Sequence, residues 1–236
     1  MPHVDGASRT LKSRTTSIRT RLARLYPGTA ETLCPLAHEG TFQLLVATIL
    51  SAQTTDVRVN MVTPALFRAY PTPEALAHAV PEELEDLIRT TGFFRSKARS
   101  LMGMAGAVVE RFGGRVPSEM AELVGLPGVG RKTANVVRSC GMGLPGLPVD
   151  THVGRLARRL GLTSRTDPED VEQDLCALVP AAQWGTFSLQ LILHGRAVCQ
   201  ARAPRCAECV LADLCPSAQL PAGIPAATAA RAQRGR

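Results

Sequence analysis

Lysine is rare in this chain, and one lysine stands where an amine could act as a nucleophile. Of 27 basic residues only Lys12, Lys97 and Lys132 are lysines, so arginine is the default cation. Arginine keeps its proton near neutral pH, whereas lysine can lose it, and only the neutral amine attacks an electrophile. Lys132 lies in the stretch LPGVGRKTANVV (residues 126–137), at the expected start of a helix and beside Arg131. The positive end of the helix dipole at this helix start and the positive charge of Arg131 both disfavour the protonated amine.

A carboxylate that could assist such an amine is Asp150, in the stretch PVDTHVGRLARRLG (residues 148–161). It precedes apolar residues at helical spacing and three arginines. Taken alone, Asp150 would be the cap of that helix, just as Lys132 taken alone would be a solvated surface lysine. Capping and catalysis do not exclude each other, so both residues are candidates for chemistry.

The residues just ahead of this lysine form a glycine-rich turn between two expected helices, over about 118–124 and about 131–140. Gly128 and Gly130 permit positive φ and a close backbone approach, so the N–H groups of the turn and of the second helix could face one phosphate. Such a hairpin would hold a nucleic-acid backbone without reading its bases. An ordinary turn between helices is the alternative, and the basic Arg131 favours phosphate binding.

Four of the seven cysteines lie together near the carboxyl end. In the stretch CQARAPRCAECVLADLC they are Cys199, Cys206, Cys209 and Cys215, with the spacing C-x6-C-x2-C-x5-C. Four thiolates this close in sequence can enclose either a tetrahedral zinc ion or a cubane iron–sulfur cluster. Zinc is the generic default for such a set, although this spacing differs from the paired CxxC pattern of zinc sites, so both alternatives stay open on the spacing alone.

Two arginines of the cysteine segment and the three remaining cysteines can also be interpreted from their positions in the sequence. Arg202 and Arg205 lie in its first loop, where they could reach a phosphate. The remaining cysteines, Cys34, Cys140 and Cys176, are isolated in the sequence, and we expect them to be small core residues.

The surplus positive charge lies at the two ends of the chain. Residues 1–33 carry six basic residues and two acids, and residues 199–236 carry five and two, so together they account for the whole net charge of +7. This excess suits a polyanionic partner, although charge alone does not separate nucleic acid from an anionic membrane surface. Residues 131–165 add seven basic residues and the single acid Asp150, and this segment is interpreted as a binding face.

The sequence also indicates a compartment. No apolar run approaches the roughly 20 residues needed to span a bilayer, and the N-terminus lacks the charged-then-apolar order of a signal peptide. We therefore expect a cytoplasmic protein. Thiols stay reduced there, so the cysteines argue for a metal site or catalysis rather than for disulfides.

The elements that must position these residues are expected to be helices. Apolar residues recur at helical spacing, as in residues 42–52, 81–92 and 171–179, while alternating strand patterns are scarce. Residues 166–170, TDPED, combine a cap, a proline and first-turn acids. The pattern predicts an all-α fold of about ten short helices. The Gly- and Pro-rich residues 142–150 are the candidate linker between two helical lobes.

Five motifs in this arrangement resemble the endonuclease III branch of the helix-hairpin-helix DNA glycosylases: LPGVGRKTANVV, VDTHV, ILSAQTTD, LILHGR and the cysteine spacing. The resemblance covers about residues 14–216 and implies two helical lobes flanking a DNA-binding groove. The implied parts are a disordered arm at 1–13, an iron–sulfur cluster domain at 14–34 plus 145–216, a six-helix barrel with the helix-hairpin-helix at 35–144, and a disordered basic tail at 217–236.

The resemblance implies a chemistry for the candidate residues. Lys132 would be the nucleophile, Asp150 its carboxylate partner, and the four clustered cysteines would hold a [4Fe–4S] cluster. The substrate would be double-stranded DNA with oxidised pyrimidines or abasic sites, the damaged base being flipped out of the duplex. Attack on C1′ would release the base, and the resulting Schiff base would allow β-elimination. We therefore expect a bifunctional glycosylase and AP lyase of base excision repair, acting as a monomer and associated with the nucleoid through DNA.

The resemblance also implies DNA contacts. Gln53 matches the residue that is inserted into the gap left by the flipped base, and His152 matches a DNA-contacting position. Phe93 stands where relatives often carry an intercalating leucine, and a larger apolar wedge can also separate a base step. Without the resemblance, Gln53 would be a polar turn residue and Phe93 a buried loop residue. His194, inside LILHGR, is expected to be a packed helix histidine.

Two alternatives remain at this point. One is an adenine-mismatch glycosylase without lyase activity, a branch that generally lacks the lysine and carries an extra C-terminal domain. The other is a non-catalytic DNA-binding or redox protein whose cluster is the working part. The presence of Lys132 argues against the first alternative, and the joint presence of Lys132 and Asp150 argues against the second.

Overall fold

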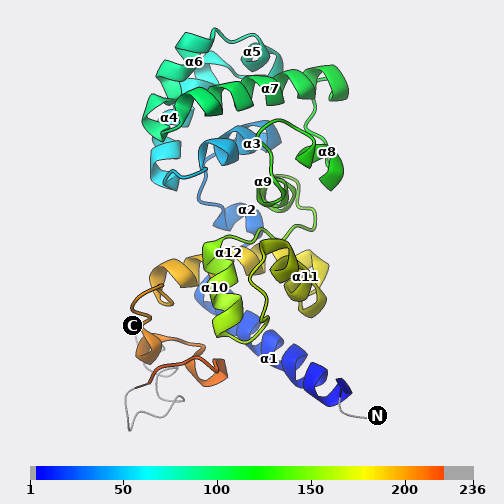
Figure 1. Cartoon of the computed structure of the whole chain (residues 1–236), viewed down its shortest axis with the longest axis vertical. Helices are drawn as coiled ribbons and strands as arrows, with labels where there is room; N and C mark the ends of the chain where they lie inside the picture. The colour runs from blue at the N-terminus through cyan, green and yellow to red at the C-terminus, as the bar shows by residue number, and fades with distance from the viewer. Residues whose placement is uncertain (1–3, 221–236) are drawn as a thin grey trace. The chain divides into compact units, whose positions relative to one another are not determined.

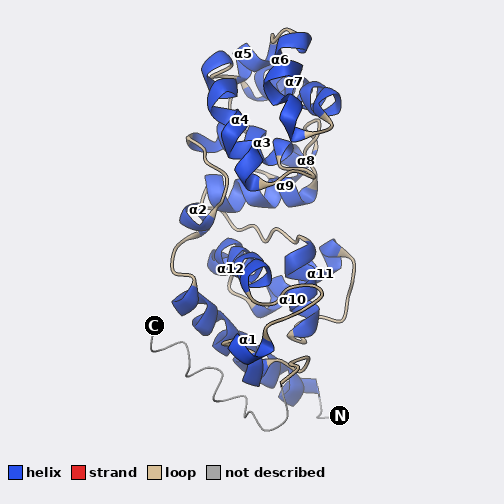
Figure 2. Cartoon of the chain, turned by 90° about the vertical axis from the view of Figure 1, so that its left-hand side faces the viewer, coloured by secondary structure: helices blue, strands red, loops and turns tan. Residues whose placement is uncertain are grey.

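The computed structural model describes residues 4–220, and every regular element in that range is a helix (Figures 1 and 2). The all-α prediction is confirmed. The chain forms two compact units: unit 2 comprises residues 34–146, and unit 1 takes residues from both sides of it, up to Leu33 and from Leu147 onward. The chain passes from unit 2 back to unit 1 between Gly146 and Leu147, inside the segment 142–150 that was expected to be the linker.

Unit 2 is built around one almost wholly buried helix, α3, whose residues from Leu44 to Leu50 are all buried. This helix contacts α4, α7, α9 and η2. Threonine N-caps start two other helices of this unit. Thr55 accepts a backbone hydrogen bond at the start of α4, and Thr72 does so at the start of α5. The elements of unit 2 are α3 (Gly40–Leu50), α4 (Asp56–Ala69), α5 (Pro73–Ala77), α6 (Pro81–Ile88), η1 (Arg89–Thr91), α7 (Phe94–Phe112), α8 (Met120–Val124), α9 (Arg131–Val136) and the π-helical turn η2 (Val137–Gly141).

Unit 1 is built around α12, which contacts α1, α2 and α10 and buries Phe187 and Leu191. The two ends of the chain meet here, because Arg21 of α1 donates to the carbonyl of Val210 at 2.8 Å and pairs with Asp213. The elements of unit 1 are α1 (Val4–Leu25), α2 (Ala30–Leu33), α10 (Thr151–Arg159), α11 (Pro168–Leu178), η3 (Ala181–Gln183), α12 (Trp184–Ala197), η4 (Cys206–Glu208) and η5 (Ala212–Leu214).

Residues 1–13 were expected to be a disordered arm, whereas in the structure α1 begins at Val4. Thr15, Ile18 and Leu22 are buried at helical spacing and fix the carboxyl half of α1 in unit 1. Once such a nucleus exists, each added helical residue gains a hydrogen bond at little further cost, so a polar segment can extend the helix. Residues 1–3, and residues 221–236 of the expected tail, lie outside the described residues.

Within residues 4–220, none of the helices taken singly has both the length and the apolar character that crossing a membrane requires. One bent pair, Pro168–Leu178 with Ala181–Ala197, meets those two criteria only when joined, and the two segments form an angle of 118°.

Candidate catalytic residues and metal centre

The glycine-rich turn ahead of Lys132 joins α8 to α9 in unit 2. Gly128 has a φ of 75°, and a Cβ there would lie 2.7 Å from the Cβ of Ser100 in α7. Glycine is therefore required both for the backbone conformation and for the close approach to α7. Gly130 is different: its φ is −90°, so it does not use the positive φ that glycine permits, and a Cβ would meet no described atom within 4 Å. The space beside Gly130 is open to an approaching ligand backbone.

Lys132 is the second residue of α9 and is exposed, as is Arg131. The support beneath them is buried, since Val129 of the turn and Ala134 of the helix both lie in the core of unit 2. A nucleophile needs an accessible amine on a backbone that is anchored in the core, and Lys132 has this arrangement. Lys97, by contrast, is buried, and its amine donates three hydrogen bonds.

Asp150 is the N-cap of α10, in unit 1, and its Oδ1 accepts the backbone N–H of Val153 at 2.9 Å. The capping interpretation is therefore confirmed. A capped carboxylate is held in one orientation at the amino end of a helix, where a negative charge is favoured. The capping bond engages Oδ1, and the catalytic role of Asp150 stays a prediction.

His152 and Arg155 lie in the first turns of α10. Their hydrogen bonds link the amino end of this helix to the segment that carries Cys199. The Nδ1 of His152 lies 3.0 Å from Nη2 of Arg155, and arginine can only donate, so Nδ1 is the acceptor. Burial lowers the pKa of His152, which favours this neutral form. Arg155 also donates to the carbonyl of Cys199 at 3.0 Å and to that of Gly195 at 3.1 Å. The arginine therefore ties the start of α10 to the end of α12.

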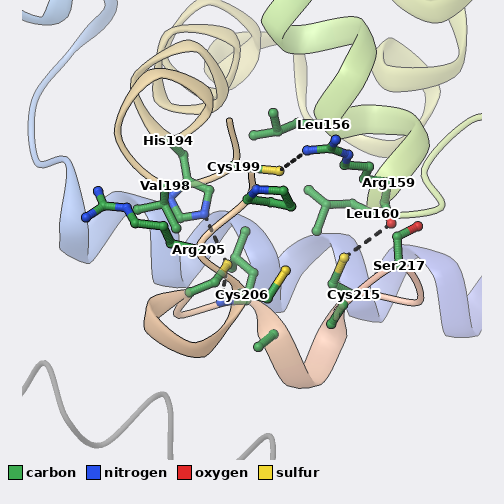
Figure 3. Close-up of a pocket in the computed structure, with 15 residues that line it drawn as sticks. Leu156, Arg159, Leu160, His194, Val198, Cys199, Arg205, Cys206, Cys215 and Ser217 are labelled. Atoms are coloured by element: carbon green, nitrogen blue, oxygen red, sulfur yellow. Dashed lines mark hydrogen bonds between the residues drawn. The ribbon is translucent and has the colours of Figure 1, made fainter. Parts of the chain in front are cut away.

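The four clustered cysteines line one pocket in unit 1, together with apolar side chains such as Leu156 (Figure 3). Each lies at or near the end of a helical segment, which directs sulfur atoms from separate turns toward the same space. They are Cys199 after α12, Cys206 and Cys209 at either end of η4, and Cys215 after η5.

The chemistry of this donor set fits an iron–sulfur cluster. Burial raises the pKa of the Cys209 thiol to about 12 and also raises that of Cys215. The thiolates of Cys209 and Cys215 are therefore disfavoured in this pocket unless a cationic centre replaces their protons. Within residues 4–220, no group of three or more His, Cys, Asp or Glu side chains is arranged as a single metal ion would require.

Arg159, on α10, is a contact of the cysteines that sequence reasoning did not single out. Its Nη1 lies 3.3 Å from the Sγ of Cys199, and its own carbonyl accepts from the Sγ of Cys215 at 3.3 Å. It also donates to the carbonyls of Gln200 and Ala201, at 2.8 Å each. The one available signal was its position four residues after Arg155, which places both arginines on the same face of a helix.

His194, on α12, has a closer relation to the cysteines than its expected role as a packed helix histidine. It is buried, with 1% of its surface exposed, as predicted. However, its Nε2 lies 3.2 Å from the Sγ of Cys209, and its Nδ1 lies 3.2 Å from the hydroxyl of Tyr26. Tyr26 follows α1, so this chain of contacts brings the N-terminal segment to the cysteine pocket.

The two arginines of the cysteine loop differ in their surroundings. Arg205 donates to the carbonyl of Ala197 and pairs with Glu208 at 3.1 Å, so its guanidinium holds the loop itself. Both arginines are exposed, and because the guanidinium of Arg205 is engaged within the loop, Arg202 is the better candidate for a phosphate contact. Of the three isolated cysteines only Cys140 is fully buried, and a hydrogen bond to it lowers the pKa of the Cys34 thiol to about 7.

Gln53 and Phe93 both lie in unit 2 and are both exposed. Phe93 exposes 68% of its surface, so the alternative of a buried loop residue is wrong. Within residues 4–220 they are the two non-glycine residues with positive φ, 55° for Gln53 and 49° for Phe93. Such a backbone is strained and persists only where neighbouring contacts impose it.

Comparison with known proteins agrees with this geometry. A family model described as the HhH-GPD superfamily base excision DNA repair protein matches residues 46–181, and a model described as the iron–sulfur binding domain of endonuclease III matches residues 199–215. Endonuclease III of Synechocystis sp. is 56% identical over 209 residues, which are 88% of this chain and 94% of that protein. Two solved structures are similar, a non-covalent endonuclease III–DNA complex and a trapped endonuclease III–DNA covalent intermediate with an estranged adenine. Each is 39% identical with a TM-score of 0.81, covering 88% of this chain and 96% of its own. The chain therefore belongs to the endonuclease III family of base excision DNA repair proteins.

Proposed function

We propose that Lys132 is the nucleophile through which this DNA glycosylase and AP lyase removes oxidised pyrimidines from duplex DNA. The observation that carries the proposal is that the Lys132 amine is exposed while the backbone beneath it is anchored by the buried Val129 and Ala134, next to the open space at Gly130. A similar endonuclease III has been trapped as a covalent intermediate with DNA, which supports a nucleophile on the protein. Bound to duplex DNA in this way, the protein would associate with the nucleoid.

The reaction starts with recognition of the damaged nucleotide outside the stack, because its sugar carbon cannot be reached inside the duplex. Gly128, Gly130 and Arg131 of the hairpin hold the phosphate backbone. Gln53 fills the gap that the flipped base leaves, and Phe93 wedges apart the adjacent base step. Both side chains suit these tasks because they are exposed on a strained, fixed backbone.

The chemical steps then follow at C1′ of the flipped nucleotide. The lone pair of the Lys132 amine forms a bond to C1′, the bond to the base breaks, and its electron pair leaves with the base, which takes up a proton. The bound amine then gives up one of its two protons, and as the C1′–O4′ bond breaks and O4′ takes up a proton, the nitrogen lone pair forms the C=N bond of a protonated Schiff base. This cation makes the C2′ proton acidic, and loss of that proton expels the 3′ phosphate. One nucleophile thus removes the base and cleaves the strand.

Asp150 supplies the negative charge that this sequence needs. Positive charge develops on the sugar as the base leaves, and a carboxylate fixed by its capping bond stabilises that charge without reorganising. Asp150 can also move the protons that the amine releases. His152, two residues later, is neutral and contacts DNA.

The family's [4Fe–4S] cluster is the cofactor, and we propose that Cys199, Cys206, Cys209 and Cys215 bind it. When bound, it gives the segment 199–215 a fixed shape, since this segment contains only the short turns η4 and η5. Arg159 contacts the sulfur atom of Cys199, and His194 contacts that of Cys209, so both side chains help to position the cysteines. Arg202, on the same loop, then presents its charge to a phosphate.

Duplexes with a single lesion test the proposed function. Duplexes containing thymine glycol or an abasic site are expected to be cleaved without alkali, because the Schiff base itself drives elimination. Strand cleavage is scored on denaturing gels with and without alkaline treatment. A duplex with an adenine mismatch serves as the control and is expected to stay intact. Cleavage that appears only after alkali would instead indicate a glycosylase without lyase activity.

Substitution of Asp150 separates its two tasks. Asn caps a helix as well as Asp does, so Asp150→Asn keeps the hydrogen bond to Val153 and removes only the charge. We expect excision to slow by about 100-fold, the range for removal of one group that stabilises a transition-state charge, while the melting temperature and duplex affinity stay near wild type. Single-turnover excision and thermal unfolding measure the two effects. Full activity in Asp150→Asn would leave Asp150 as a cap alone.

A further inference from the structure

Lys97 is a buried lysine that the proposed reaction does not use. It lies in the first turns of α7, exposes 6% of its surface, and belongs to a chain whose other basic residues are nearly all arginine. Its Nζ donates three hydrogen bonds: to the carbonyl of Leu50 at 2.8 Å, to Oγ1 of Thr54 at 2.9 Å and to the carbonyl of Thr91 at 2.8 Å. An ammonium has three donors, so this amine is fully satisfied.

The three acceptors come from two segments that are far apart in the sequence. Leu50 and Thr54 enclose the turn after α3, and Thr91 ends η1. Thr54 joins the two segments directly as well, because its hydroxyl donates to the carbonyl of Thr91. Each acceptor is an uncharged oxygen, and the last carbonyls of α3 carry the negative end of the helix dipole, which favours a cation.

These two segments carry the two strained, exposed residues of the unit. Gln53 lies between Leu50 and Thr54, and Phe93 lies two residues after Thr91. Lys97 also holds Phe93 through the backbone, because its N–H donates to the Phe93 carbonyl at 3.0 Å. The Gln53 and Phe93 side chains point to solvent, so their strained backbone serves no packing in the free protein. Strain of this kind is kept at sites where a side chain must be aimed.

We infer that Lys97 is a positioning residue that clamps the two turns together, so that Gln53 and Phe93 enter the DNA stack at adjacent places. All three acceptor atoms lie within 2.9 Å of one nitrogen, which fixes the spacing of the turns. A shorter, uncharged or apolar side chain would leave the carbonyls of Leu50 and Thr91 without this partner and let the turns separate. The inference rests on the proposed gap-filling roles of Gln53 and Phe93. It does not depend on which residue is the nucleophile.

The test measures base extrusion separately from chemistry. The probe is a duplex with a tetrahydrofuran abasic analogue, which cannot form a Schiff base, and with 2-aminopurine opposite it to report unstacking. Lys97→Met keeps the length of the side chain and removes the ammonium. We expect the equilibrium constant for extrusion, read from the 2-aminopurine signal, to fall by about tenfold or more, because losing hydrogen bonds to a charged donor weakens the arrangement that they hold by at least about this factor. Lys12→Met, the same substitution in α1, is the matched control and is expected to extrude normally.

A second arm excludes a general loss of structure. Borohydride trapping on a single-stranded abasic oligonucleotide needs no extrusion, so Lys97→Met is expected to trap within about twofold of wild type. Should Lys97→Met fail to fold, Thr54→Val removes one acceptor, keeps the lysine, and is expected to show the same split between the two assays. An equal loss in both assays, or wild-type extrusion in a folded variant, overturns the inference.

Double-mutant cycles connect the clamp to the residues it positions. If Lys97 acts through Gln53 and Phe93, then Lys97→Met adds little to the extrusion defect of Gln53→Ala with Phe93→Ala. Additive defects would mean that Lys97 acts elsewhere and would overturn the inference. A failure of the proposed nucleophile is recognised separately, since it changes trapping by Lys132 variants and leaves the extrusion assay untouched.

Discussion

Lys132→Gln is expected to abolish borohydride trapping of DNA that contains thymine glycol or an abasic site. The amide cannot form a Schiff base, so both the covalent adduct and the strand cleavage that depends on it are lost. Base excision is expected to fall by at least about three orders of magnitude, as when a nucleophile is removed from other enzymes. Duplex binding is expected to persist, because the hairpin glycines and Arg131 are unchanged. Trapping gels and single-turnover excision measure the two activities.

The scarcity of lysine makes this prediction sharp. The amines that can be trapped are those of Lys12, Lys97 and Lys132, together with the terminal amine. Lys97 is buried and fully hydrogen-bonded, and Lys12 lies on α1 of unit 1. Lys12→Gln is therefore the matched control and is expected to trap like wild type. If Lys132→Gln excised the base normally and still trapped, the nucleophile would lie elsewhere and Lys132 would be a phosphate contact.

Local patterns predicted much of the fold. Helical periodicity and start signals depend on residues close in sequence, so the segments 42–52 and 171–179 fall on α3 and α11, and Asp167 and Pro168 start α11 as the TDPED pattern indicates. The beginning of α1 was less predictable. The sequence there has few large apolar residues, and the helix continues from the half that Thr15, Ile18 and Leu22 bury further along.

The candidate site was predictable where a motif is contiguous and was not where contacts join distant segments. Gly128 and Gly130 look alike in sequence, yet only Gly128 needs positive φ, because only it packs against Ser100 of α7. The partners of Lys97 are mainly backbone carbonyls, which no side-chain pattern reveals. Arg159 and His194 reach the cysteines from two separate helices. Such contacts depend on how helices pack, which sequence spacing within one helix does not encode.

The cysteine spacing, in contrast, was informative because all four ligands lie within one segment of the chain. The zinc and iron–sulfur alternatives differ in the metal content of the pure protein. We expect about four irons per chain and a yellow-brown colour, since a cubane cluster has four irons and four thiolate ligands. Stoichiometric zinc without iron after anaerobic purification would overturn the cluster assignment.

Cys206→Ser is expected to remove the iron and to lower the melting temperature by about 10 °C, which corresponds to a few kcal/mol for a chain of this size. The reason is that metal binding free energy is also folding free energy: the segment 199–215 has two short helical turns, and its four cysteines line one pocket that the cluster would hold together. Without the cluster this segment keeps side-chain contacts such as those of Arg21 and Arg159 but loses the centre that joins its four cysteines, so Arg202 loses its fixed position. Cys176→Ser, in α11 and outside the cysteine pocket, is the matched control and is expected to keep its iron. Iron analysis, visible absorption and thermal unfolding are measured together. If Cys206→Ser kept four irons and the wild-type melting temperature, Cys206 would not be a ligand, and the segment would owe its shape to Arg159 and His194 instead.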